Sequence, residues 1–215
     1  MFRLIKLIKK TIIVLIVFIL LLSVGLFYIS TSYPLIYEDS IARYSTEFGV
    51  DFHLVASIIN VESKYDRNAI SRKNARGLMQ IGQQTGQWAS EVLEIEDYDE
   101  ESLFEPDTNI RIGAWYINIL MAEFDDNLDL VLASYNAGSG NVSKWLCQSE
   151  YSRDGKSLDN IPFKETEDYL RKVKSNYRVY SRIYRSMKNG RNLDSFYINF
   201  LHNIRRTIKS LIGLS

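Results

Sequence analysis

The sequence predicts a mainly α-helical domain that follows one transmembrane helix. Apolar residues recur at intervals of three and four in several stretches between Tyr37 and Tyr184, which is the spacing of one helix face. No alternation of apolar and polar residues of comparable strength predicts a strand. A chain of 215 residues, of which 46% are apolar, has room for one domain of ordinary size and an appendage.

The N-terminal segment predicts a membrane anchor. Residues 1–10 form a basic flank without an acid, and the next charged residue is Glu38. About 20 apolar residues span the hydrocarbon core of a bilayer, and a basic flank stays on the cytoplasmic side. We therefore expect residues 11–31 to form a single-pass signal-anchor in the cell membrane, with the rest of the chain on the extracytoplasmic side. The alternative is a cleaved signal peptide and a secreted protein, although the apolar run exceeds a usual h-region and no clear cleavage site follows it.

Two helices are expected to open the domain. The first runs from Tyr37 to Phe48, with Gly49 as its C-terminal stop. Asp51 is placed to cap the second, which ends at Glu62.

Glu62 lies one turn beyond Ile58 on the apolar face of this second helix. Removal from water penalises the charged form of a carboxyl group, so the pKa of Glu62 should rise and the side chain could hold a proton near neutral pH, as a general acid must. The alternative is a Glu that turns outward at a fraying helix end, or that pairs with Arg72.

The residues that follow Glu62 favour the first interpretation. Ser63 comes directly after it, Ser71 follows, and Gly77–Ile81 reads GLMQI. This pattern resembles the catalytic domain of soluble-type lytic transglycosylases, a branch of the lysozyme-like superfamily. The resemblance implies a lysozyme-like helical domain around a central substrate groove. It also implies Glu62 as the single catalytic acid/base, with Ser63, Ser71 and Gln80 as substrate-binding residues.

The sequence departs from the family pattern at three places. Arg67 stands where a Pro is common, Asn74 where a Gly is common, and Gly82-Gln83 where Met-Pro usually follows. Asn tolerates positive φ better than other non-glycine residues, so the change at Asn74 is physically mild. Gly82 removes a side chain that the family often places against the sugar.

Two further helices continue the resemblance. Pro106 is expected to start the first, in which Gly113 would let another helix approach closely. The second is expected to break at a glycine-rich run after Tyr135 and Asn136, which match the A-x-Y-N-A-G element of the family. In that element the Tyr reaches toward the catalytic Glu and the sugar, so Tyr135 and Asn136 are expected to bind substrate.

The last helix of the domain carries the final motif. Thr166 is expected to cap this helix, and tyrosines up to Tyr184 are expected to pack in the core along one face. Glu165, Thr166 and Tyr169 match the E-T-x-x-Y-V motif of the family, with Leu170 in place of Val. Because that Glu and Tyr border the cleft in the family, Glu165 and Tyr169 are expected to bind substrate. The resemblance covers residues 38–185.

Other residues exclude several functions. Residues 11–185 are net acidic, which argues against nucleic-acid binding. One cysteine and two distant histidines suggest no disulfide and no zinc site, and the acidic segment Glu91–Glu105 is interpreted as a solvated connection rather than a calcium loop. No metal or organic cofactor is therefore expected. The basic residues 186–215 predict an amphipathic helix that lies on an anionic membrane or packs against the domain.

The resemblance implies a reaction on peptidoglycan glycan strands, at the β-1,4 bond between N-acetylmuramic acid and N-acetylglucosamine. Ordinary glycosidases use two carboxylates, whereas these motifs place only Glu62 at the centre. Glu62 would protonate the glycosidic oxygen, and the acetamido group of the substrate would stabilise the sugar cation. Glu62 would then take the proton of the C6 hydroxyl, which closes a 1,6-anhydro ring.

Two alternatives to this reaction remain open at the level of sequence. One is a lysozyme-type hydrolase, in which a second carboxylate such as Asp66 activates water. The other is a wall-binding module of a secretion or conjugation apparatus, without turnover. Trp88, Trp115 and Trp145 could stack on sugar rings in any of these proteins, or could lie in the core.

Overall fold

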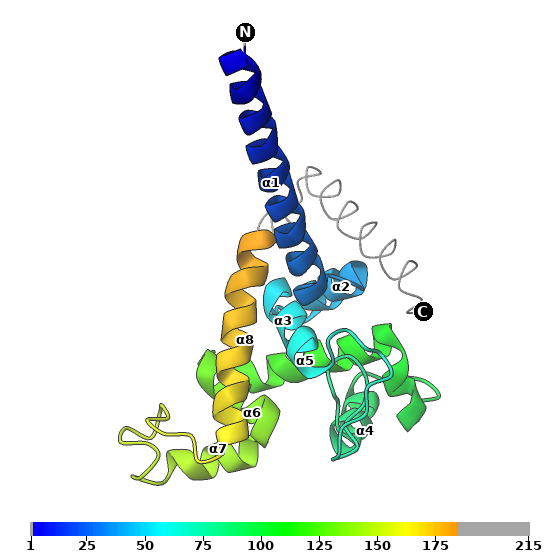
Figure 1. Ribbon diagram of the computed structural model, residues 1–215. Helices are drawn as coiled ribbons and strands as arrows, with labels where there is room; N and C mark the ends of the chain where they lie inside the picture. The colour runs from blue at the N-terminus through cyan, green and yellow to red at the C-terminus, as the bar shows by residue number, and fades with distance from the viewer. Residues whose placement is uncertain (1, 185–215) are drawn as a thin grey trace. The chain divides into compact units, whose positions relative to one another are not determined.

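The computed structural model describes residues 2–184, which fall into an N-terminal segment up to Pro34 and a compact domain from Leu35 onward (Figure 1). The expected amphipathic helix at 186–215 lies outside the described residues. Helix α1, Phe2–Ser32, makes up almost all of the N-terminal segment. Its stretch Ile5–Ser32 contains an 18-residue window with a mean hydropathy of 3.2, and by length and composition it can cross a membrane.

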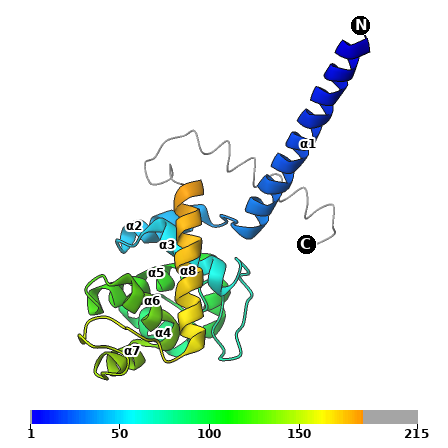
Figure 2. The ribbon, with the colours of Figure 1, turned by 60° about the vertical axis from the view of Figure 1, so that its left-hand side comes forward.

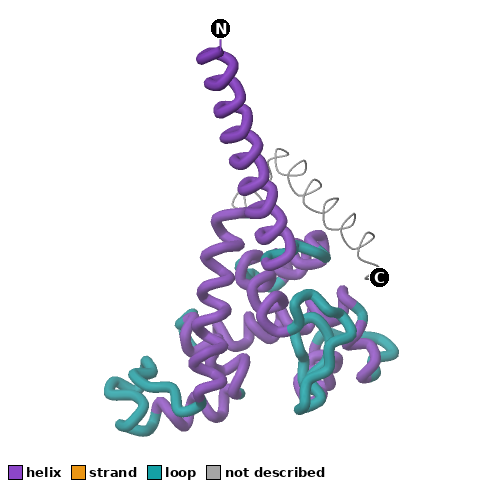
Figure 3. The backbone as a smooth tube through the Cα atoms, in the orientation of Figure 1, coloured by secondary structure: helices purple, strands orange, loops and turns teal. Residues whose placement is uncertain are grey.

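Within the described residues the regular elements of the domain are helices, which are joined by loops and accompanied by two isolated β-bridges (Figure 3). In chain order its elements are α2 (Glu38–Glu47), α3 (Phe52–Glu62), α4 (Gln83–Val92), the 3₁₀ helix η1 (Glu100–Phe104), α5 (Pro106–Glu123), α6 (Leu128–Ala137), α7 (Ser139–Leu146) and α8 (Lys164–Ile183). The mainly α class expected from the sequence is confirmed.

Helix α8 packs along α3 and along α6 (Figure 2). Residues 53–60 of α3 are all buried, so this helix is enclosed on every side and not only along the face that carries Ile58. Full burial of each Ile or Leu side chain contributes roughly 1.5–3 kcal/mol of transfer free energy. Glu62 therefore stands at the end of a helix that the core holds on all sides.

The helix ends predicted from Asp51, Pro106 and Gly49 are confirmed. The Asp51 side chain accepts hydrogen bonds from the backbone N–H groups of His53 and Leu54, as expected of an N-cap. Pro106 is the first residue of α5, and Gly49 follows α2 with a φ of 67°.

Two expectations about the helices were wrong. Helix α8 begins at Lys164, so Thr166 lies inside its first turn, where it is buried and does not cap the helix. Gly113 makes room for the side chain of Met79 from the GLMQI turn rather than for another helix, because a Cβ at Gly113 would lie 2.2 Å from the Met79 sulfur. Helices α4 and α7 were not anticipated.

The acidic segment is only partly the solvated connection that was expected. Its residues Glu100 and Glu101 lie in η1, and their carboxylates hold the guanidinium of Arg76 at 2.8 and 2.7 Å. Leu103, in the same helix, is fully buried. This segment therefore attaches η1 to the loop that follows Glu62. Among the described residues no group of His, Cys, Asp and Glu has the arrangement of a metal site.

Candidate active site

Glu62 is a largely buried carboxyl group whose pKa is shifted far from its ordinary value. It is the last residue of α3, and burial raises the pKa of its carboxyl group to about 7. The Tyr169 hydroxyl opposes this effect in part by favouring the charged form, and the negative charge of Glu165 adds to it. Near neutral pH the side chain can therefore hold a proton and can also lose one, as general acid/base chemistry requires.

The loop from Ser63 to Gly82 is held beside Glu62 by backbone hydrogen bonds. Gly77 N–H donates to Ala69 O at 2.9 Å, and Arg76 and Ile81 exchange two bonds of 3.0 Å. Gly77 has a φ of +75°, and a Cβ there would lie 2.2 Å from Leu103 O, so this turn requires glycine.

Asn109 of α5 holds this loop through its side-chain amide. It is fully buried, its Oδ1 accepts from Met79 N–H at 2.7 Å, and its Nδ2 donates to Arg76 O at 3.0 Å and Leu103 O at 2.8 Å. One amide thereby satisfies three buried backbone groups, which fixes the GLMQI turn relative to α5 and η1. An Asn among apolar helix residues was the signal that could have revealed it.

Ser63, Ser71 and Gln80 all make hydrogen bonds within their own segment. Ser63 Oγ donates to Ile59 O at 3.2 Å, and Ser71 Oγ accepts from the N–H groups of Lys73 and Ala75 at 3.2 and 3.0 Å.

Gln80 has a φ of 50°, and its Nε2 donates to Ala69 O and Gly77 O at 3.0 Å each. These bonds use both donors of the amide and leave Oε1 as the group with which Gln80 can meet a ligand. The proposed contacts of these three residues with substrate stay predictions.

Tyr135 and Tyr169 bring two hydroxyl groups to the surroundings of Glu62. Burial raises the pKa of both phenols well above its usual value, and the charge of Glu62 raises it further. The Tyr135 hydroxyl donates to Met79 O at 2.9 Å. The Tyr169 hydroxyl is buried beside the Glu62 carboxyl group, and its interaction with that group favours the carboxylate.

Asn136 and Glu165 occupy the junction of α6 and α8. Thr166 Oγ1 donates to Asn136 Oδ1 at 2.8 Å, which joins the two helices and leaves the Asn136 amide nitrogen for another partner. Glu165 is exposed in the first turn of α8. Glu165 and Tyr169 thus both influence the pKa of Glu62. The charge of Glu62 in turn influences the pKa of Tyr135 and of Tyr169.

The other aromatic and histidine candidates separate by burial. Trp115 and Trp145 are buried in the core, whereas Trp88 is 44% exposed. His53 is buried and its Nε2 lies 3.1 Å from Tyr184 O, which agrees with a packing role. Asp66 is exposed, and its carboxylate accepts from Asn68 N–H at 3.0 Å within the loop.

Comparison with known proteins identifies the relatives of this domain. A family model described as the transglycosylase SLT domain matches residues 39–158. The soluble lytic murein transglycosylase of Salmonella typhimurium is 33% identical over 165 residues, which cover 76% of this chain and 25% of that protein. The membrane-bound lytic murein transglycosylase C of Edwardsiella ictaluri is 28% identical over 176 residues, covering 68% of this chain and 47% of that protein.

Solved structures give the same result. The 70 kDa soluble lytic transglycosylase from Escherichia coli superposes with a TM-score of 0.62 and 29% identity, covering 70% of this chain and 25% of that chain. An inactive mutant of the lytic transglycosylase Slt from Pseudomonas aeruginosa superposes with a TM-score of 0.63 and 28% identity, covering 72% and 25% of the two chains. The chain spans about a quarter of the length of these soluble relatives.

Proposed function

The chain belongs to the transglycosylase SLT domain family, and on that basis we propose that it is a lytic transglycosylase of peptidoglycan. Its reaction cleaves the β-1,4 bond between N-acetylmuramic acid and N-acetylglucosamine and leaves a 1,6-anhydromuramic end. The observation that carries this proposal is the raised pKa of Glu62, about 7, at the motif position of the catalytic acid.

The proposed mechanism uses Glu62 twice. The protonated carboxyl group donates to the glycosidic oxygen as the bond breaks, and the carboxylate that results accepts the proton of the C6 hydroxyl as that oxygen attacks the sugar cation. The acetamido group of the substrate stabilises the cation between the two steps. The buried phenols of Tyr135 and Tyr169 keep their protons, so neither competes with Glu62 as the base.

Two nearby acids have other proposed roles. Glu165 favours the protonated form of Glu62 through its negative charge, which helps the first step. Asp66 is exposed and engaged in its own turn, which makes it a poor activator of water. We therefore favour ring closure by the C6 hydroxyl over hydrolysis.

The decisive experiment is a mass spectrum of the muropeptides that the chain releases from purified peptidoglycan in water enriched in ¹⁸O. We expect products that end in 1,6-anhydromuramic acid, which are one water lighter than lysozyme products and carry no ¹⁸O. Reducing ends labelled with ¹⁸O would show a hydrolase and would direct attention to Asp66 and Glu165. Binding without release of any muropeptide would show a wall-binding module.

We also propose that α1 anchors the domain to the cell membrane with its basic N-terminus in the cytoplasm. Support comes from the apolar part of the stretch Ile5–Ser32, which follows the basic flank, and from the membrane-bound relatives. A reporter fused after Tyr37 should lie outside the membrane and sediment with it. A soluble product whose N-terminus lies beyond Ser30 would show instead that the segment is cleaved.

A further inference from the structure

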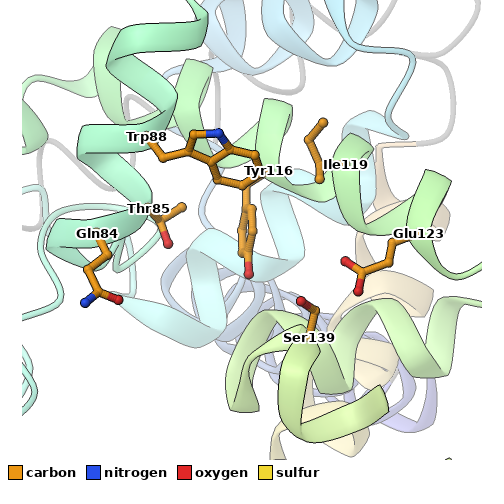
Figure 4. Close-up of a pocket in the computed structure, with 7 residues that line it drawn as sticks. All are labelled: Gln84, Thr85, Trp88, Tyr116, Ile119, Glu123 and Ser139. Carbon is orange, nitrogen blue, oxygen red and sulfur yellow. The ribbon is translucent and has the colours of Figure 1, made fainter. Parts of the chain in front are cut away.

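A pocket of about 260 Å³ lies between α4, α5 and the first residue of α7 (Figure 4). Tyr116 forms part of its wall, and the Tyr116 ring also packs against Tyr135 with 5.6 Å between ring centroids. The pocket therefore adjoins the tyrosine that stands next to Glu62, and the proposed mechanism gives it no role. A volume of this size suits one small group of a larger ligand.

The wall of the pocket combines an aromatic face, hydroxyl groups and one carboxylate. Trp88 is 44% exposed and packs edge-on against Trp115 at 4.6 Å, which holds its ring in place. The hydroxyls of Tyr116 and Ser139 and the carboxylate of Glu123 point toward one another (Figure 4). Such a set can accept several hydrogen bonds from one donor group.

Glu123 is the charged residue of this wall. Burial raises the pKa of the Tyr116 hydroxyl, and the charge of Glu123 raises it further, which shows that the carboxylate acts on that hydroxyl. No lysine or arginine lines the pocket, and Glu123 forms no salt bridge within residues 2–184. Glu123 is exposed, and a carboxylate that lines the same pocket as a partly exposed indole ring can attract an ammonium group.

We propose that this pocket binds a free ammonium group of the peptidoglycan, and that Glu123 and Trp88 thereby select amine-bearing strands. The identity of the polymer rests on the proposed function. Two parts of peptidoglycan can supply the group: the side-chain amine of a diamino acid in an uncrosslinked peptide stem, and the 2-amino group of a glucosamine that has lost its acetyl group.

The test measures binding in the full chain that carries Glu62→Gln, so that strands are retained. Its affinity for purified peptidoglycan strands is compared with its affinity for the same strands after acetylation of every free amine. We expect acetylation to weaken binding about 3- to 30-fold, the range for a partly exposed ion pair with a cation–π contact. Glu123→Gln, added to Glu62→Gln, should remove this difference.

Glu96→Gln is the matched control, because Glu96 is an exposed carboxylate outside the pocket, and it should leave the difference unchanged. Strands stripped of peptide stems but rich in deacetylated glucosamine separate the two sources. A difference that persists on them assigns the glucosamine amine, and a difference confined to strands with intact stems assigns the diamino acid.

Two results would overturn the inference. One is equal affinity for native and acetylated strands, which needs no variant at Glu123 and so does not depend on how Glu123→Gln folds. The other is a difference that survives Glu123→Gln in a chain with an unchanged circular dichroism spectrum. A wild type that binds strands with this selectivity but releases no anhydro products would contradict the proposed function and leave the ammonium site standing.

Discussion

The hydroxyl of Tyr135 donates a 2.9 Å hydrogen bond to the carbonyl oxygen of Met79, and this bond ties α6 to the GLMQI turn. Met79 is fully buried, so its carbonyl oxygen has little access to water. Tyr135 therefore makes a structural hydrogen bond and also interacts electrostatically with Glu62. The two roles can be separated by experiment.

Tyr135→Phe should lower both stability and turnover. The ring still packs, but the Met79 carbonyl loses its donor, which costs about 1–3 kcal/mol of unfolding free energy. Turnover should fall as well, since the hydroxyl near Glu62 is absent. Urea unfolding and rates of muropeptide release measure the two effects. Lower stability with unchanged turnover would restrict Tyr135 to a structural role.

The pH dependence of activity should follow the protonation of Glu62. The general acid must be protonated, so kcat/KM should fall as pH rises through about 7, the pKa of this group. Because the charge of Glu165 raises that pKa, Glu165→Gln should move the midpoint to lower pH. Glu167→Gln is the control, since Glu167 is exposed in the same turn of α8 and pairs with Lys164. If the wild type, Glu165→Gln and Glu167→Gln have the same midpoint, the charge of Glu165 has no influence on the pKa of Glu62.

Glu62→Gln should abolish activity and stabilise the domain at alkaline pH. The folded-state pKa of about 7 exceeds the ordinary value of 4.5, so the native state binds more protons than the unfolded state between these pH values. Wild-type stability should therefore fall as pH rises from 4.5 to 7 and then level off. The variant avoids this loss, of the order of 3 kcal/mol at pH 8 and much less at pH 5. Urea unfolding in detergent at both pH values measures the gap, and a gap independent of pH would contradict the assignment.

Two glycine substitutions should have opposite signs. In Gly113→Ala the new Cβ would lie 2.2 Å from the Met79 sulfur and 3.2 Å from its Cβ, so overpacking should cost about 1–3 kcal/mol. Gly140 lies in α7 with nothing within 4 Å of its Cβ position, so Gly140→Ala should gain up to about 1 kcal/mol of helix propensity. Thermal unfolding of both variants measures the contrast. If Gly113→Ala and Gly140→Ala destabilise the domain by similar amounts, the contact with Met79 is not the cause of the loss at Gly113.

The sequence sufficed for features whose causes lie within one segment. Asp51 caps α3 with its own side chain, and the apolar spacing up to Glu62 marks a buried helix, so both could be predicted from a few neighbouring residues. Helix α7 was missed because Gly138, with a φ of 87°, ends α6 and at once precedes a new helix. A glycine-rich break alone does not tell whether a helix follows it.

Features that depend on distant partners could not be predicted. Glu100 and Glu101 read as solvated charges, because nothing in their own segment indicates that Arg76 would meet them. The motif predicted that Gln80 lies near Glu62. It did not predict that the Gln80 amide donates to the carbonyl oxygens of Ala69 and Gly77. In each case tertiary contacts outweighed the local pattern.

The contact between Thr166 and Asn136 explains why a threonine lies inside α8, and a matched pair of substitutions can test it. Thr166 is 1% exposed and its Oγ1 donates to Asn136 Oδ1 at 2.8 Å, so Thr166→Val keeps the shape but leaves a polar atom without its donor. We expect a loss of about 1–3 kcal/mol in unfolding free energy. If Asn136 binds substrate as proposed, kcat/KM should also fall, since its side chain is then no longer held by Thr166. Thr46→Val is the control: its Oγ1 donates to Ala42 O at 2.8 Å on an exposed helix face, and the change should stay within about 0.5 kcal/mol. Equal effects of the two substitutions would show that the bond between α6 and α8 contributes nothing beyond a surface hydroxyl.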